Sequence, residues 1–205
     1  MVNNSGAQII TLWELYGCGM EQIAARVAED LNIPLHGQAF SSDEIEQSAA
    51  DRERQGVFGR FLDTLPPLAT STTGAAEAAI TKAQAVGETA RQVTEDVNGF
   101  AEEGGLVLGR NGAYLLHERP GALHVKLVGQ LEARIVNAAK LTGITPERAA
   151  KRQPIEDAFR RELSLEVFHF DPTADDYYDL VIDATRFSVE QVATIIVTAA
   201  RILAA

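Results

Sequence analysis

The chain has 205 residues, of which 46% are hydrophobic and 23% charged, the balance of an ordinary globular domain rather than of a disordered chain. Its net charge of −11 argues against non-specific binding to nucleic acid or to an anionic membrane surface. A single cysteine excludes an internal disulfide framework, and no apolar run reaches the ~20 residues that span a bilayer. Residues 1–8 lack the layout of a signal peptide. We therefore expect one soluble, cytoplasmic domain.

The first predicted elements are a strand, a glycine turn and a helix. Residues 8–13 form a short apolar run typical of a strand, and the sequence Tyr-Gly-Cys-Gly follows at 16–19. Residues 21–31 then carry apolar side chains at helical spacing. Pro34 ends this helix, because proline lacks a backbone N–H and restricts the residue before it.

The middle of the chain is predicted to be mainly helical. Residues 41–44 have the spacing of a capping box and begin a polar helix that runs to about residue 55. An apolar stretch at 57–68 precedes the clearest loop, at 69–74. Residues 75–103 are alanine-rich and helical, as one helix or two. This segment is suited to pair with a copy of itself, so the sequence allows a homodimer.

Short strands alternate with helices in the second half of the chain. Strands are predicted at residues 106–108, 122–128 and 180–182, and helices at 113–118, 131–141, from 145 onward and from 188 to about 203. Strands separated by helices in this order predict an α/β fold, with a mostly parallel sheet covered on both faces.

Two glycine turns mark the place where a ligand would bind. A parallel sheet binds ligands beyond the carboxyl ends of its strands, and residues 16–19 and 109–112 each follow a predicted strand. The first turn leads into a helix N-terminus, where unpaired N–H groups favour a phosphate. The strict P-loop pattern GxxxxGK[ST] is not met. On spacing alone, a phosphate site and a plain strand-to-helix connection are equally supported.

Positive charge is concentrated in one segment of this acidic chain. Residues 134–161 contain seven cations and three acids, which gives a net charge of +4. Arginine outnumbers lysine 14 to 4 in the whole chain, and its planar guanidinium suits bidentate phosphate contacts. The pattern favours an oxyanion-binding flap over about 134–170, with a solvated helix face as the alternative.

The order of these motifs resembles the cytidylate kinase-like family, a branch of the P-loop nucleoside monophosphate kinases. The resemblance implies one three-layer P-loop kinase domain, with a helical acceptor-side insertion at about 38–104. The sequences that carry it are ITL at 10–12, YGCG at 16–19, IP at 33–34, LVLGR at 106–110, Asp157-x-x-Arg160, YDL at 178–180 and IDAT at 182–185.

The same resemblance implies ATP-dependent phosphoryl transfer to a nucleoside monophosphate, CMP-like, or to a similar small phosphorylated acceptor. Such transfer depends on charge neutralisation and positioning. Asp157 would position an arginine. The resemblance places Gly17, Cys18, Gly19, Met20, Glu21 and Arg134 at the ATP phosphates, Arg110 at the acceptor phosphate, and Arg152, Arg160 and Arg161 over the transferring group.

The chain departs from the family pattern at the donor side. Met20 and Glu21 stand where a full P-loop has a lysine and a hydroxyl, and Trp13, Glu14 and Leu15 replace the family's S-R-E. The donor site thereby loses two cations and gains two acids. Magnesium held between Glu21 or Glu14 and the phosphates would compensate. The alternatives are a catalytically degenerate nucleotide-binding or protein-interaction module, and a kinase for a non-nucleotide acceptor.

Three further residue types have a structural interpretation. Cys18 replaces the small serine of the family, an interpretation we prefer to that of a reactive thiol. Trp13 is expected in the core or in a pocket wall. Phe159, Phe168 and Phe170 are expected to pack under the flap.

Overall fold

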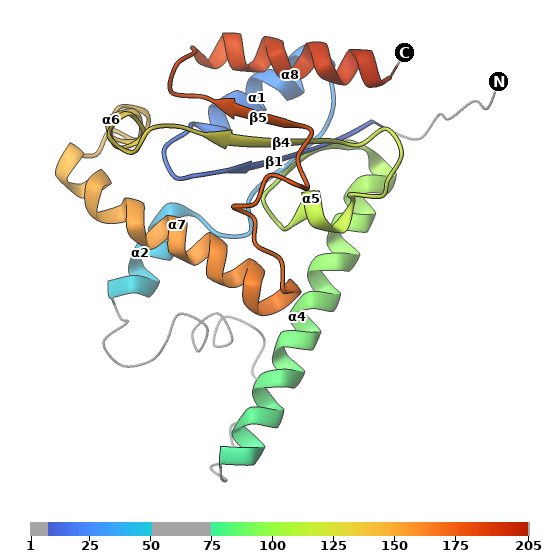
Figure 1. Ribbon diagram of the computed structural model, residues 1–205, viewed down its shortest axis with the longest axis vertical. Coiled ribbons are helices and arrows are strands. Elements are labelled where there is room, and N and C mark those ends of the chain that lie inside the picture. Colours follow the sequence, from blue (N-terminus) through green and yellow to red (C-terminus); the bar gives the residue numbers. More distant parts are fainter. Residues whose placement is uncertain (1–7, 51–74, 205) are drawn as a thin grey trace.

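The computed structural model describes residues 8–50 and 75–204, which form an α/β protein around a five-stranded sheet (Figure 1). The strands lie in the order β2-β3-β1-β4-β5, and each neighbouring pair is parallel. The predicted parallel α/β fold is therefore confirmed. The strands are β1 (Ile9–Glu14), β2 (Leu35–His36), β3 (Gly105–Leu108), β4 (Leu123–Val128) and β5 (Leu180–Asp183).

The helices agree closely with the sequence pattern where the structure describes them. Residues 75–103 form one helix of 29 residues, and the predictions for 57–68 and 69–74 lie outside the described residues. None of the described helices is long and apolar enough to cross a membrane. The helices are α1 (Met20–Leu31), α2 (Ser42–Ala50), α4 (Ala75–Glu103), α5 (Gly112–Leu115), α6 (Leu131–Thr142), α7 (Pro146–Phe168) and α8 (Val189–Leu203).

Helices cover both faces of the sheet (Figure 1). On one face, Ile10 of β1 packs with Ile23 of α1 and Ile196 of α8 in the main core. On the other face, Ile9 packs with Val97 of α4. Successive side chains of a strand point to opposite faces, so these two neighbouring isoleucines reach different layers. The result is three layers, with the sheet in the middle.

The predicted helix caps are present. Ser188 and Gln191 form a reciprocal capping box at α8, and the Thr145 side chain accepts a hydrogen bond at the start of α7. Ser41 and Glu44 exchange hydrogen bonds at the start of α2. Each cap satisfies N–H groups that the first helical turn leaves without a partner. These local signals explain why the helix starts were predictable.

The arrangement of the elements brings the two glycine turns to one edge of the sheet. β1 and β3 are parallel neighbours, so the segments that follow them, 15–19 and 109–111, lie at the same edge. The long helix α7 packs there against both α2 and α4 (Figure 1). This edge therefore has walls formed by segments that are far apart in the sequence.

Candidate functional site

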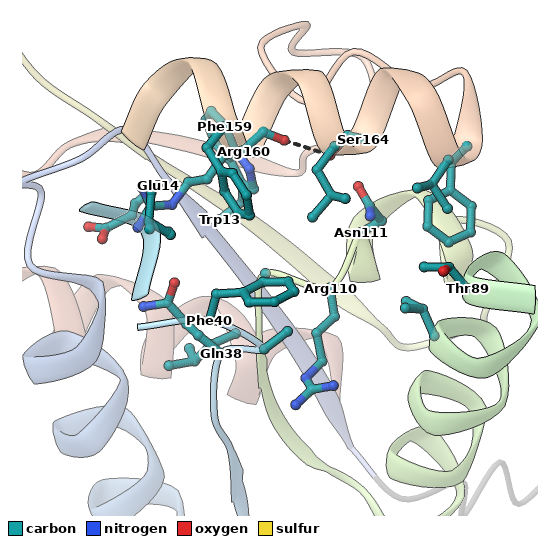
Figure 2. Close-up of a pocket in the computed structure, with 18 of the residues that line it drawn as sticks. Trp13, Glu14, Gln38, Phe40, Thr89, Arg110, Asn111, Phe159, Arg160 and Ser164 are labelled. Carbon is teal, nitrogen blue, oxygen red and sulfur yellow. Dashed lines mark hydrogen bonds between the residues drawn. The ribbon is translucent and has the colours of Figure 1, made fainter. Parts of the chain in front are cut away.

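A cavity of about 180 Å³ lies beyond the carboxyl ends of β1 and β3, between α4 and α7 (Figure 2). A concave, mostly apolar pocket with a few polar groups is the usual form of a small-molecule site. Glu14, Arg110 and Arg160 are its charged residues. Its apolar and aromatic wall includes Trp13, Met20, Phe40, Phe159, Leu163 and Phe168.

Arg110 stands at the edge of this cavity, just after β3. Its Nε donates a hydrogen bond to the carbonyl oxygen of Gly37 at 3.0 Å, and its guanidinium lies 3.6 Å from the Asp96 carboxylate. The guanidinium carbon is 5.5 Å from the centre of the Phe100 ring. Figure 2 shows the side chain extending away from α7. Arg110 thus presents a partly exposed cation at the rim of the cavity rather than in its centre.

The first glycine turn is held tightly against α6. Gly17 and Gly19 have φ angles of 89° and 83°, which glycine adopts without steric cost. A Cβ on Gly17 would lie 2.3 Å from the carbonyl oxygen of Arg134, and the Asn137 side chain donates to the Gly17 carbonyl oxygen at 2.7 Å. Cys18 is buried, and this burial raises the pKa of its thiol. The thiol is therefore protonated at neutral pH.

The carboxylate of Glu14, the last residue of β1, caps the helix that follows the turn. Its Oε2 accepts a hydrogen bond at 3.0 Å from the N–H of Met20, the first residue of α1. Burial raises the pKa of Glu14 to about 7, and the nearby Arg160 guanidinium acts in the opposite direction. The Met20 side chain is itself buried in the core. One of the N–H groups that would face a phosphate is therefore bonded to a carboxylate of this chain.

Arg160 of α7 links Glu14 to a second buried acid. Figure 2 shows the Arg160 side chain reaching toward Glu14, and its Nη1 donates to Oε2 of Glu156 at 2.5 Å. Glu156 is fully buried, and its other carboxylate oxygen has no hydrogen-bond partner among the described residues. The hydroxyl of Tyr16 is likewise buried without one in the described part of the chain. Glu14, Arg160 and Glu156 thus form a row of alternating charges from the glycine turn to α7.

Arg134 and Asp157 fasten the turn to α6 and α7. Nη1 of Arg134 donates to the Tyr16 carbonyl oxygen at 3.0 Å and to Oδ2 of Asp157 at 2.9 Å. Oδ1 of the same carboxylate accepts from the Tyr16 N–H at 2.7 Å. Asp157 therefore holds Arg134, and its role toward an arginine of a phosphate site stays a prediction. The Arg134 side chain is only 7% exposed and does not line the cavity, so its contacts serve to hold the turn in place.

Two further flap arginines pair with carboxylates outside the cavity. Arg152 is buried and bonds to Glu46 and Asp43 of α2. Hydrogen bonds from Arg148 and Arg152 lower the pKa of Glu46 to about 2. Arg161 lies on the surface and donates to Asp171 at 2.7 Å. These contacts satisfy both arginines without any ligand.

The cavity brings together only part of the residue set expected from the sequence. Met20, Arg110 and Arg160 line it. Glu21 is exposed, and its carboxylate accepts from the Gln38 side chain at 3.3 Å. Within 8–50 and 75–204, no group of three or more His, Cys, Asp or Glu residues could hold a metal ion. The remaining expected residues lie outside the cavity lining, and they are Gly17, Cys18, Gly19, Glu21, Arg134, Arg152 and Arg161.

The fold and the glycine turn define a class of protein. A central strand of a parallel sheet that leads through a glycine turn into a helix is the arrangement of the P-loop kinase-like α/β proteins. The chain belongs to the cytidylate kinase-like family, whose model matches residues 9–186. The resemblance stated from the sequence motifs is thereby confirmed.

Two solved structures are similar over nearly the whole chain. An uncharacterized protein from Eubacterium ventriosum has a TM-score of 0.61 and 17% identity, over 95% of this chain and 98% of that one. A gluconokinase from Sinorhizobium meliloti has a TM-score of 0.48 and 14% identity, over 97% of this chain and 94% of that one. At 17% identity, the likeness to the first of these structures concerns the fold and not the substrate.

One curated relative is named as an isomerase and not as a kinase. A uronate isomerase from Corynebacterium glutamicum is 34% identical over 140 residues, which is 68% of this chain. The chain spans only 27% of the length of that protein. The activity named for the whole relative therefore does not pass to this chain.

ATP and magnesium, which the family implies, do not fit the residues of the glycine turn. The first N–H of α1 is bonded to Glu14, and a buried methionine follows the turn in place of a lysine. The acid next to it, Glu21, adds negative charge to the same helical turn. A triphosphate placed here would meet like charges and no cation from this segment. The cavity beside the turn remains the better candidate for a ligand.

Proposed function

We propose that this chain binds a nucleoside monophosphate, or a similar small phosphorylated molecule, in the cavity and does not transfer a phosphoryl group. It would be a nucleotide-binding module of kinase descent, working in the cytoplasm. The observation that carries the proposal is an aromatic cavity with Arg110 at its rim, beside a helix N-terminus capped by Glu14. The first feature favours binding, and the second opposes the use of ATP.

The cavity suits a ligand that is a ring at one end and an anion at the other. Phe40 and Phe159 meet edge to face, with ring centres 5.5 Å apart, and Trp13 adds a third aromatic surface. Aromatic side chains favour a planar base by stacking and by apolar contact. At the rim, the guanidinium of Arg110 can exchange its bonds to Gly37 and Asp96 for a phosphate.

The proposal is tested by calorimetric titration of the chain with CMP and other nucleoside monophosphates. Arg110→Ala should weaken binding by about 10- to 150-fold, because one charge-assisted contact contributes roughly 1.5–3 kcal/mol. Arg26→Ala is the matched control, since it removes an exposed arginine of α1 that pairs with Asp30. It should bind like the wild type. Unchanged affinity in Arg110→Ala would remove Arg110 from the site, and no binding of any monophosphate would contradict the proposal.

ATP-dependent phosphoryl transfer to such an acceptor is the second candidate. It is favoured by membership of the cytidylate kinase-like family and by the retained strand, glycine turn and helix. ATP and magnesium would then be the cofactors. ADP formation, measured with a panel of nucleoside monophosphates, separates the two candidates. Steady turnover supports the kinase, whereas monophosphate binding without turnover supports the module.

A further inference from the structure

We propose that the carboxyl group of Glu14 takes the place of a donor phosphate at the glycine turn, so that this turn accepts no nucleoside triphosphate. The inference goes beyond the proposed function, because it concerns the donor half of the molecule and not the ligand of the cavity.

The Glu14 side chain lies at the N-terminus of α1, where the fold would place a phosphate. The N-terminal N–H groups of a helix attract anions, and α1 has a glycine, Gly19, at its N-cap that offers no side chain to satisfy them. Glu14 reaches across the turn from the end of β1, six residues before Met20, and bonds its N–H at 3.0 Å. Above pH 7, where Glu14 is mainly ionised, its carboxylate also gains from the helix dipole as a phosphate would. The chain therefore supplies its own anion where the fold would receive one.

The charged residues around Glu14 oppose the entry of a phosphate at the turn. The carboxylate of Glu14 has Arg160 as its nearby cation, and Arg160 is itself bonded to Glu156 at 2.5 Å. An entering phosphate would have to displace Glu14 from Met20. It would then face the negative charges of Glu14 and Glu21, with Arg160 already shared between two acids. Coulomb repulsion thus opposes triphosphate binding even where the backbone shape allows it.

The experiment compares Mg-ATP binding to the wild type, Glu14→Ala and Glu14→Gln by calorimetry at matched ionic strength. The wild type should bind no Mg-ATP at millimolar concentration. Glu14→Ala, which frees the Met20 N–H and removes the charge, should bind Mg-ATP with a dissociation constant at least about tenfold below the millimolar limit set by the wild type. Glu14→Gln should fall between them, because it loses the charge and keeps an acceptor oxygen. Glu29→Ala, an equal charge change on an exposed part of α1, should behave like the wild type.

A second measurement keeps the test independent of any nucleotide. In NMR spectra of the wild type, the Met20 amide resonance should move as Glu14 titrates between pH 5.5 and 8.5, and in Glu14→Gln it should stay nearly still. The other charged groups that act on Glu14 are Arg160 and Glu156 of α7 and Glu21 of α1.

Three results would overturn the inference. They are sub-millimolar Mg-ATP binding by the wild type, no gain in either folded Glu14 variant, and a Met20 amide resonance that is the same in the wild type and in Glu14→Gln at every pH. Titration of the same samples with CMP reports on the cavity separately. Loss of CMP binding would therefore contradict the proposed function and leave the inference on Glu14 intact.

Discussion

At the residue scale, two glycines with left-handed backbone differ in what surrounds them. Gly17 has φ 89°, and a Cβ there would lie 2.3 Å from the carbonyl oxygen of Arg134. Gly109, after β3, has φ 64°, and a Cβ there would meet nothing within 4 Å. A side chain at Gly109 therefore costs only the backbone conformation. A side chain at Gly17 also has to move the backbone of α6.

This difference predicts unequal effects of alanine at the two positions. Gly109→Ala should lower the free energy of unfolding by about 1–2 kcal/mol, the cost of a left-handed non-glycine residue. Gly17→Ala should lower it by a further ~1–3 kcal/mol, because backbone atoms must shift. Urea denaturation followed by circular dichroism measures both. Equal destabilisation by the two variants would show that α6 does not press on the turn.

At the scale of the elements, one buried ion pair joins the turn, α6 and α7. The pair of Arg134 and Asp157 has side chains only 7% and 19% exposed, and both residues also bond to the backbone of Tyr16. Removing one charge of such a pair leaves the other buried and without its partner. Removing both together avoids that cost.

Asp157→Asn should therefore destabilise the protein by about 3 kcal/mol, the lower end of the range for a broken buried pair. The double variant Arg134→Met with Asp157→Leu should lose less than the sum of the two single variants. Arg91→Ala, on an exposed part of α4 where it pairs with Glu88 and Glu95, should change stability by less than about 1 kcal/mol. Chemical denaturation of the set gives the coupling energy. Strict additivity would mean that Arg134 and Asp157 do not support each other.

At the scale of the whole molecule, the fold was predictable because its signals are local. Short apolar runs, apolar side chains at helical spacing, helix caps and Pro34 identified four of the five strands and the described helices, whereas β2 has only two residues and no pattern of its own. The site was predictable only in part. Arg152 meets Glu46 across 106 positions of sequence, and Tyr16 meets Asp157 across 141. Such pairings depend on tertiary structure.

The buried acid of the turn links the stability of the molecule to pH. The pKa of Glu14 is about 7 in the folded protein against an ordinary value of 4.5, so the folded state binds more protons between these values. Stability contributed by this group is then greatest below pH 4.5 and falls as pH rises to about 7, by up to about 3 kcal/mol. Glu14→Gln removes this dependence. Its free energy of unfolding relative to the wild type should therefore increase from pH 4.5 to about 7.5.

Denaturation of both proteins at several pH values checks this expectation. Glu46 and Asp171 have pKa values of about 2 and are present in both proteins, so their contributions cancel in the difference. A difference that stays constant with pH would mean that Glu14 titrates normally.

The backbone of α6 touches the glycine turn at Gly17. Packing therefore requires a glycine at this position whether or not the turn binds a phosphate. A larger residue there would impair folding in any descendant that keeps α6 in place, with or without a phosphate to bind. Position 20 carries no such penalty, since Met20 is well accommodated in the core. Folding alone thus requires a glycine at position 17, whereas it does not require a cation at position 20.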